Sequence, residues 1–371
     1  MIPFVNLNEQ RKAYQNELKN TIENVLESGC FIGGDHVFSL ENELSEYLKK
    51  KSNSSSDIYT TLCGSGTDAL TIALMALAIA PGDEVIVPDF TFIAPAEAVS
   101  LLGATPIFAD IDAQTLQIQP QSVESKITEK TKGIIAVNLF GQCAPYTELQ
   151  RIAEKHNLWI IEDAAQSFGA TQINSKGNLQ ASCTFGNIST TSFYPTKPLG
   201  CYGDGGALFT QDTKLAERIK MIANHGSQSH YQHKLIGVNS RLDAIQAAIL
   251  QVKLRHLDCE LAKRTENAKK YDEYFSGQNG IRIQRTAIGN TSTYAQYTLL
   301  VDDRDSFTNK LNSLKIPYCI HYPAPLHNQE CFCKTPCRGF NPNATLASKQ
   351  AVSLPICAFT HVETILQLMG R

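Results

Sequence analysis

Hydrophobic side chains recur with two different periods along the chain, and these periods predict its elements. Apolar residues stand at helical spacing through 18–29 and 38–50, so the first fifty residues are predicted to be helical. From about residue 58 to residue 210, short apolar and β-branched runs alternate with helical stretches. The runs predicted to be strands are 58–63, 83–90, 105–111, 133–140, 158–164, 188–193 and 207–210, and the predicted helices between them include 66–80, 93–103 and 146–157.

The continuous apolar character of these strands indicates burial on both faces, which favours a largely parallel sheet in an α/β fold. A helical pattern then runs through 242–275, much longer than a typical globular helix, which suggests that it bridges two lobes or lies along a partner subunit. The remainder is predicted as a smaller α+β domain with strands at 294–301 and 318–322 and a final helix at 361–369. We therefore expect a large domain over 1–250, including the N-terminal helical segment, and a small domain over 251–371.

Composition narrows the possible functions. A formal net charge of -3 in 371 residues gives no basic field for a nucleic-acid backbone, and no apolar run is long enough to span a membrane. The 11 cysteines are scattered, which suits a reducing compartment, so we expect a cytoplasmic protein. Cys331, Cys333 and Cys337 crowd together with His327 nearby, but the spacing favours an ordinary cysteine-containing loop over a metal site.

Candidate chemistry lies just after the strands, where α/β sheets bind ligands. Gly66 and Thr67 open a helix after the first strand, an arrangement that either cradles a phosphate or simply caps the helix. Asp163, followed by Gln166, ends a buried strand and either meets a cation or caps a helix. Lys197 lies in a loop rich in glycine and hydroxyl groups, which makes it either a nucleophilic amine or an exposed lysine.

Further candidates lie around these three. Ser192 could bind a phosphate oxygen near Lys197, and Phe92, like Phe90, could stack on a planar ring or lie in the core. Asn239 and Arg241 stand before the long helix, where they either cap it or bind phosphate or carboxylate. Together the candidates supply a phosphate cradle, a ring-stacking aromatic, a carboxylate for a ring nitrogen and a Schiff-base lysine, which are the parts that pyridoxal phosphate requires.

The strings GTDAL, PDFTFIA, EDAAQSFGA, TSFYPTKPLGCYGDGG and GVNSRLDAIQAAIL occur in this order over nearly the whole chain. In this combination the sequence resembles the DegT/StrS-type nucleotide-sugar aminotransferases, fold type I pyridoxal-phosphate enzymes of the aspartate aminotransferase superfamily. The resemblance implies a homodimer whose active sites are shared between subunits. It also implies that Lys197 binds the cofactor as a Schiff base and that Asp163 pairs with its pyridine nitrogen.

The resemblance assigns roles to the other candidates as well. Gln166 would lie near the cofactor's 3-hydroxyl group and Phe92 over its ring. The phosphate would be bound by Gly66, Thr67 and Ser192, together with Asn239 of the other subunit. Arg241, His321 and Tyr322 would contact the nucleotide sugar.

Within the family, SFYPTKPLGCYGDGGA, YAQYT and HYPAPLH are most similar to enzymes that transfer an amino group from L-glutamate to C3 of a UDP-linked 3-oxo-glucuronate sugar, for bacterial surface polysaccharide such as O-antigen. The segment 173–184 departs from shorter versions of its loop. Rival interpretations are an aminotransferase for a 4-ketosugar or a dTDP-linked 3-ketosugar, a sugar dehydratase, and a non-catalytic regulatory protein. Dehydratases of this type carry histidine in place of the lysine, and a non-catalytic protein would be expected to lose the lysine or the carboxylate; Lys197 and Asp163 disfavour both.

Overall fold

The structure, a computed structural model, describes residues 2–336 and 339–370. Its centre is a seven-stranded sheet in the order β1-β9-β8-β5-β4-β2-β3. The strands are β1 (Tyr59–Cys63), β2 (Glu84–Pro88), β3 (Thr105–Ala109), β4 (Thr131–Val137), β5 (Trp159–Asp163), β8 (Ile188–Ser192) and β9 (Gly206–Thr210). β9 is antiparallel to both of its neighbours, and the remaining pairs are parallel. All seven predicted strands form this mostly parallel sheet, and the α/β fold is confirmed.

Helices cover both faces of the sheet, because alternate residues of each buried strand point to opposite sides. Val85 and Val87 pack toward one helical layer and Ile86 toward the other. The first layer contains α4 (Gly66–Ala76), α5 (Ala94–Leu101) and α8 (Thr213–Ala223). The opposite face is covered by α6 (Pro120–Ser125), α7 (Tyr146–His156) and, toward β1 and β9, α3 (Asp35–Ser52).

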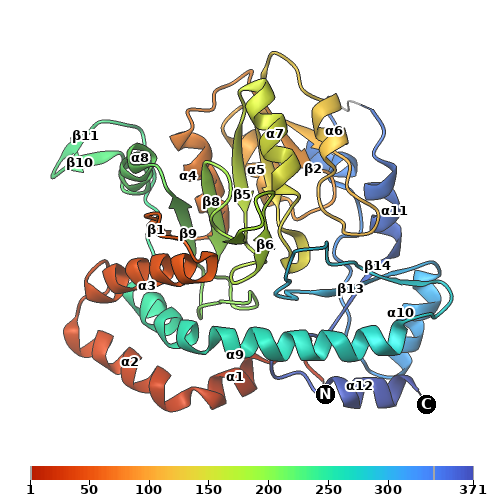
Figure 1. Ribbon diagram of the computed structural model, residues 1–371. Helices are drawn as coiled ribbons and strands as arrows, with labels where there is room; N and C mark the ends of the chain where they lie inside the picture. Colours follow the sequence, from red (N-terminus) through yellow and green to blue (C-terminus); the bar gives the residue numbers. More distant parts are fainter. Residues whose placement is uncertain (1, 337–338, 371) are drawn as a thin grey trace.

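The predicted long helix is α9 (Ala244–Phe275), which runs along the base of the molecule in Figure 1. Leu250 and Leu257 in its first half share a core with α3, whereas Tyr271 and Phe275 near its end belong to the core of the smaller domain. The helices α1 (Leu7–Ala13), α2 (Gln15–Ser28) and α12 (Val362–Met369) lie beside it. The predicted domain boundary at residue 250 thus falls inside one continuous helix.

The smaller domain is built on an antiparallel sheet of β12 (Ile281–Ile283), β13 (Tyr297–Val301) and β14 (Ala351–Leu354). It also contains α10 (Arg304–Ser313), α11 (Pro342–Gln350) and the short 3-10 helices η2 (Leu326–Asn328) and η3 (Glu330–Phe332). The strand predicted at 318–322 is wrong, since only Cys319 bridges to Ser353. His321 and Tyr322 leave the sheet because their rings pack among aromatic side chains of the large domain.

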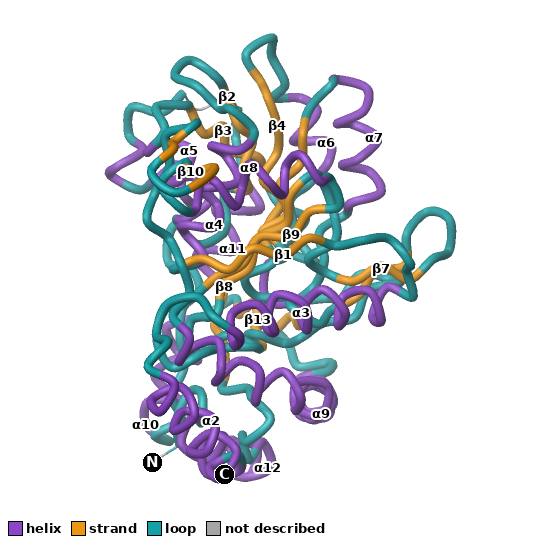
Figure 2. Tube along the Cα trace, turned by 90° about the vertical axis from the view of Figure 1, so that its left-hand side faces the viewer, coloured by secondary structure: helices purple, strands orange, loops and turns teal. Residues whose placement is uncertain are grey.

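Two hairpins project from the body. One consists of β6 (Thr171–Ile173) and β7 (Leu179–Ala181), which protrudes in Figure 2, and it accounts for the unusual segment 173–184. The other consists of β10 (Ser227–Ser229) and β11 (Gln232–His233) and extends beyond α8 in Figure 1. In the described part of the chain, no helix combines the length and apolar character that a membrane crossing requires.

Candidate active site

The carboxyl ends of β2, β4, β5 and β8 lie at one edge of the sheet because these strands run in the same direction. β1 shares this direction, since two successive antiparallel pairings relate it to β8 through β9. The residues that follow these strands therefore meet at one edge, although the chain separates them widely. Ligands of α/β sheets bind at such an edge.

Asp163 is the last residue of β5 and is almost completely buried. Within the described residues, its carboxylate accepts one hydrogen bond, from the backbone N–H of Ala165 at 3.0 Å. Burial raises the pKa of Asp163, and the positive charge of Lys197 opposes this rise. A buried carboxylate with one donor and a cation nearby is a suitable partner for a protonated ring nitrogen.

The preceding residue, Glu162, points to the opposite face of the sheet and serves a different purpose. It is fully buried and accepts five hydrogen bonds, from Asn138 Nδ2, Ser182 Oγ, Ser189 Oγ and the backbone N–H groups of Cys183 and Phe185, at 2.7–3.0 Å. Burial raises the pKa of Glu162, and these donors oppose the rise. Glu162 therefore joins the ends of β4, β5 and β8 to the segment after β7. Its carboxylate already has hydrogen-bond donors from the protein and needs none from a ligand.

Lys197 lies in the loop between β8 and β9, and its backbone N–H donates to the carbonyl of Tyr194 at 2.9 Å. Burial of the amine lowers the pKa of Lys197, and the negative charge of Asp163 opposes this shift. Lys253 of α9 anchors the same loop, because its buried Nζ donates to the carbonyl of Gly200 at 2.6 Å. A lysine with a lowered pKa and a fixed loop is suited to nucleophilic attack on a carbonyl.

The first turn of α4 lies directly against the end of β8. A Cβ atom added to Gly66 would stand 2.7 Å from the Cβ and 3.1 Å from the Oγ of Ser192, so only glycine permits this approach. Ser65 caps the helix by accepting from the N–H of Asp68 at 3.0 Å. Thr67 lies in this first turn, so the helix N-terminus and the Ser192 hydroxyl form one corner, which we call the phosphate corner and whose donors suit an anion.

Gln166, His321 and Tyr322 form the wall that connects the two domains. Gln166 accepts from the N–H of Phe140 at 2.5 Å and donates to the Tyr322 hydroxyl at 3.4 Å. Burial and the charge of Lys197 lower the pKa of His321 to about 4, and burial raises the pKa of Tyr322. Phe90 is a core residue, whereas Phe92 is 55% exposed with its ring centroid 6.3 Å from that of Tyr322.

Asn239 and Arg241 are exposed, and no contact among the described residues connects them to Lys197 or Asp163. Neither caps α9, whose N-cap residue is Asp243. Arg241 instead lines a separate hollow of about 940 Å³ between α3, α8 and the β10–β11 hairpin. Ser240 between them accepts from the backbone N–H of Gly64 at 2.9 Å and donates to Asp68 at 2.6 Å, so this segment borders the first turn of α4, while the Asn239 and Arg241 side chains make no hydrogen bond to Lys197 or Asp163 among the described residues.

The buried Lys197 amine, the Asp163 carboxylate and the corner at Gly66 and Ser192 fit pyridoxal phosphate as a Schiff-base partner, a ring-nitrogen partner and a phosphate site. A model of the DegT/DnrJ/EryC1/StrS aminotransferase family matches residues 12–370. The chain belongs to this family. Enzymes of the DegT/DnrJ/EryC1/StrS family are pyridoxal-phosphate-dependent aminotransferases, and the predicted cofactor is confirmed at this level.

Several curated members of the family are similar over nearly their full length. The UDP-2-acetamido-2-deoxy-3-oxo-D-glucuronate aminotransferase of Pseudomonas aeruginosa is 43% identical over 98% of both chains. The pleiotropic regulatory protein of Geobacillus stearothermophilus is 40% identical over 96% of this chain and 93% of its own. The dTDP-3-amino-3,4,6-trideoxy-alpha-D-glucose transaminase of Streptomyces venezuelae is 36% identical over 96% of this chain and 91% of its own.

Solved structures of the family share this fold. A DegT/DnrJ/EryC1/StrS aminotransferase from Brucella abortus has a TM-score of 0.93 at 36% identity, covering 100% of this chain and 99% of its own. A Bacillus subtilis protein with bound cofactor PMP has a TM-score of 0.86 at 28% identity, covering 97% of this chain and 82% of its own. Both likenesses extend over the large and the small domain.

Some residues around the site escaped the sequence analysis. Lys253 stands in a long helix and has no neighbouring motif, so its bond to Gly200 gives no local signal. The sequence offers His327 only as a neighbour of the cysteine-containing loop, whereas in the structure its ring lies against Asp89. Among the described residues no group of three metal-ligating side chains gathers, and Cys337 lies outside those residues.

Proposed function

We propose that this enzyme transfers the amino group of L-glutamate to C3 of UDP-2-acetamido-2-deoxy-3-oxo-D-glucuronate, giving the 3-amino sugar and 2-oxoglutarate. The observation that carries the proposal is the 43% identity, over 98% of both chains, to the relative named for this substrate. The reaction would serve bacterial surface polysaccharide such as O-antigen. The ten cysteines among the described residues are all free, which supports a cytoplasmic site of action.

When bound, pyridoxal phosphate supplies an aldehyde that accepts the amino group and a ring that withdraws electrons from the reacting carbon. Lys197 would hold the cofactor through its amine in the resting enzyme. With glutamate bound, the free amine of Lys197 would take the proton from Cα of the amino acid and return it during the transfer. Burial favours this role, because a lysine with a lowered pKa is more often neutral and able to accept a proton.

Asp163 would keep the ring nitrogen protonated. Its carboxylate lies at the end of a rigid central strand, so its position is fixed before the cofactor binds. His321, with its pKa lowered to about 4, is neutral at physiological pH. It can therefore bind a hydroxyl or carbonyl group of the sugar without adding a second positive charge beside Lys197.

The active site is completed by a second copy of the chain in this proposal. Asn239 would reach the partner's cofactor phosphate, and Arg241 would bind the nucleotide sugar on the partner's side. Support comes from the separation of these two residues from Lys197 and from the exposed apolar side chains of Phe38 and Ile32 in the hollow beside Arg241. Apolar side chains gathered in this way are typical of interfaces.

Mixing two inactive variants tests the shared site. Lys197→Ala and Arg241→Ala should each lack activity, but a mixed dimer carries both changes in one site and leaves the other site intact. Dissociation and reassociation of an equal mixture should restore about a quarter of the wild-type activity. A mixture that stays inactive while forming mixed dimers would place Arg241 in the same site as Lys197 of its own chain.

The substrate test supplies the enzyme with 15N-labelled L-glutamate and a panel of UDP- and dTDP-linked 3- and 4-ketosugars. Mass spectrometry should find nitrogen transferred to the UDP-linked 3-oxo-glucuronate sugar, with Lys197→Ala as the inactive control. Transfer to a dTDP-linked sugar alone would favour the activity for which the relative at 36% identity is named. A deoxygenated sugar without nitrogen would identify a dehydratase, and no half-reaction with any amino donor would favour a regulatory protein.

A further inference from the structure

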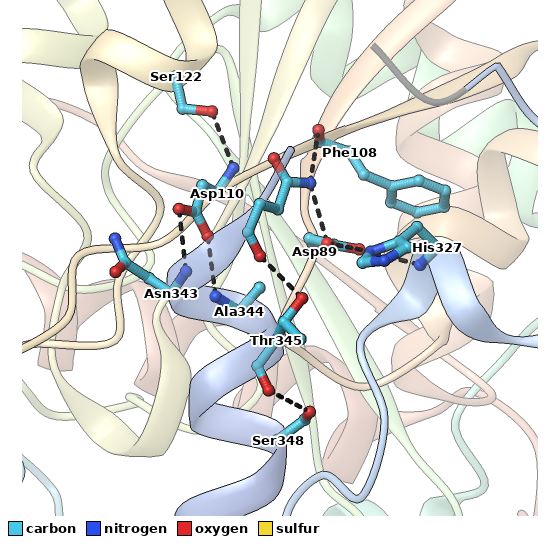
Figure 3. Close-up of polar contacts among 10 residues, drawn as sticks. Asp89, Phe108, Asp110, Ser122, His327, Asn343, Ala344, Thr345 and Ser348 are labelled. Atoms are coloured by element: carbon cyan, nitrogen blue, oxygen red, sulfur yellow. Dashed lines mark hydrogen bonds and ion pairs between the residues drawn. The ribbon is translucent and has the colours of Figure 1, made fainter. Parts of the chain in front are cut away.

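A second polar cluster lies beside the active site, at the carboxyl end of β2. Asp89 is completely buried there. Its Oδ2 lies 2.5 Å from Nδ1 of His327, and its Oδ1 accepts from the backbone N–H of His327 at 2.9 Å (Figure 3). The same Oδ2 also accepts from Nδ2 of Asn341 at 2.9 Å. The backbone carbonyl of Asp89 also accepts from the N–H of Leu326 at 2.8 Å. One aspartate thus connects the large domain to two segments that follow more than 230 residues later.

The cluster, which we call the Asp89 clamp (Asp89, His327 and Asn341), is strong for its size. A buried carboxylate is costly to desolvate unless it is well supplied with donors, and the described residues offer three to the Asp89 side chain. Hydrogen bonds to a carboxylate are shorter and stronger than those between neutral groups. The clamp therefore fixes the end of β2 relative to the segments that carry His327 and Asn341.

The two segments joined by the clamp meet a second time over the active site. Phe90 and Phe92 follow Asp89, and Tyr322 precedes His327 by five residues. The Tyr322 ring centroid lies 6.0 Å from that of Phe90 and 6.3 Å from that of Phe92, and the Tyr322 hydroxyl accepts from Gln166 at 3.4 Å. Tyr322 is thus held from two sides: Cys319 and His321 before it bond to Ser353 of β14, and the clamp holds the segment after it.

The residues proposed for the cofactor's phosphate and ring nitrogen make no bond to the clamp, whereas Phe92 and Gln166 contact Tyr322. Gly66, Asp163 and Ser192 belong to α4, β5 and β8, and none of them contacts Asp89 or His327 through a hydrogen bond between described residues. Loss of the clamp should therefore disturb the wall formed by Tyr322 more than the cofactor site.

Asp110 offers a matched comparison within the same view. It follows β3, is also buried, and accepts from the backbone N–H groups of Asn343 at 3.2 Å and Ala344 at 2.8 Å (Figure 3). Asp110 thus also ties the large domain to the C-terminal segment. It holds the first turn of α11, directly after Asn341 of the clamp, and makes no hydrogen bond among the described residues to the segment that carries Tyr322.

We infer that Asp89 and His327 are positioning residues for the sugar half of the reaction and act through Tyr322. The inference rests on the proposed function. It predicts that loss of the clamp raises KM for the ketosugar and leaves the half-reaction with glutamate almost unchanged, because the proton-moving Lys197 and the cofactor site stay in place.

The experiment compares Asp89→Asn, His327→Leu and Asp110→Asn in the full-length holoenzyme. The first two variants should raise KM for the ketosugar about tenfold or more, since each loses charge-assisted hydrogen bonds. Their rate of cofactor conversion with L-glutamate alone, followed by absorbance, should stay within about twofold. Asp110→Asn should change neither quantity, even if it lowers the thermal stability. His327→Asn should keep KM for the ketosugar close to the wild-type value, because the asparagine amide nitrogen can take the place of the histidine Nδ1.

Hydrogen exchange gives a readout that needs no sugar. Amides of residues 318–328 should exchange faster in Asp89→Asn than in Asp110→Asn, with residues 188–197 unchanged. Equal losses in both half-reactions, equal effects of Asp110→Asn, or unchanged exchange in 318–328 would overturn the inference. If the wild-type enzyme aminates no ketosugar, the proposed function fails, and the exchange of 318–328 still decides whether the clamp holds this segment.

Discussion

Replacing Gly66 with alanine should weaken cofactor binding, because the new methyl group would collide with Ser192. The added Cβ would stand 2.7 Å from the Ser192 Cβ, whereas ordinary contact begins at 3.4 Å, so the two residues must separate by about 0.7 Å. The body of β8 is buried and holds its position, so the displacement is confined to Ser192 at its half-buried end. The phosphate corner would open on the side that the Ser192 hydroxyl supplies.

The size of the effect follows from the cost of overpacking, about 1–3 kcal/mol. In the cofactor-free enzyme Ser192 can move aside, and binding must bring it back, so this cost falls on binding. The dissociation constant for pyridoxal phosphate should rise about 5- to 150-fold at 25 °C. Folding should be retained, because alanine is a better helix former than glycine in the first turn of α4.

A double-mutant cycle isolates the collision from other effects. Cofactor affinity is measured by absorbance titration of the cofactor-free enzyme for Gly66→Ala alone and in Ser192→Gly and Ser192→Ala backgrounds. Ser192→Gly removes the colliding Cβ and should abolish most of the loss, whereas Ser192→Ala keeps the Cβ and should not. Equal losses in both backgrounds, or wild-type affinity of Gly66→Ala, would refute the packing argument.

Three further predictions concern ionisable groups. Lys197→Ala should still bind pyridoxal phosphate but lose its covalent attachment and all turnover; a retained attachment, detected as a cofactor that resists denaturing dialysis after borohydride reduction, would exclude Lys197. The pKa of His321 is lowered from 6.5 to about 4, so between these pH values the unfolded chain binds a proton that the folded chain does not. As the pH falls from 6.5 to 4, the wild type should therefore lose stability relative to His321→Asn, by about 1.4 kcal/mol per pH unit. Burial lowers the pKa of Lys253 from 10.5 to about 8, so between these pH values the unfolded chain again binds the additional proton. As the pH rises from 8 to 10, the wild type should therefore gain stability relative to Lys253→Met, by about 1.4 kcal/mol per pH unit. Urea unfolding of the cofactor-free proteins measures both differences; parallel pH profiles for either pair would contradict the corresponding shift.

The sequence predicted the strands of the central sheet and the long helix α9, because burial on both faces and helical periodicity are properties of neighbouring residues. It was wrong at 318–322, where an apolar, strand-like run leaves the small sheet. There the rings of His321 and Tyr322 pack against the large domain, and a contact with a distant part of the chain outweighs the local pattern.

For the proposed active site, the sequence by itself singled out the residues to which we assign the chemistry. Lys197, Asp163 and the Gly66–Thr67 turn are recognisable because each stands after a strand in a motif whose residue types are unusual for their surroundings. The different fates of Glu162 and Asp163 are also implicit in the alternation of a strand, which sends consecutive side chains to opposite faces.

Only the tertiary structure decided which distant residues support those motifs. Gly66 lies against Ser192, Lys253 donates to Gly200, and Asp89 is bonded to His327. The two hydrogen-bonded pairs are 53 and 238 positions apart in the sequence. None of these contacts leaves a local pattern, because the partner of a buried polar group is set by the packing of whole elements. The sequence determined which side chains stand at the edge of the sheet, and the fold determined which distant residues hold them there.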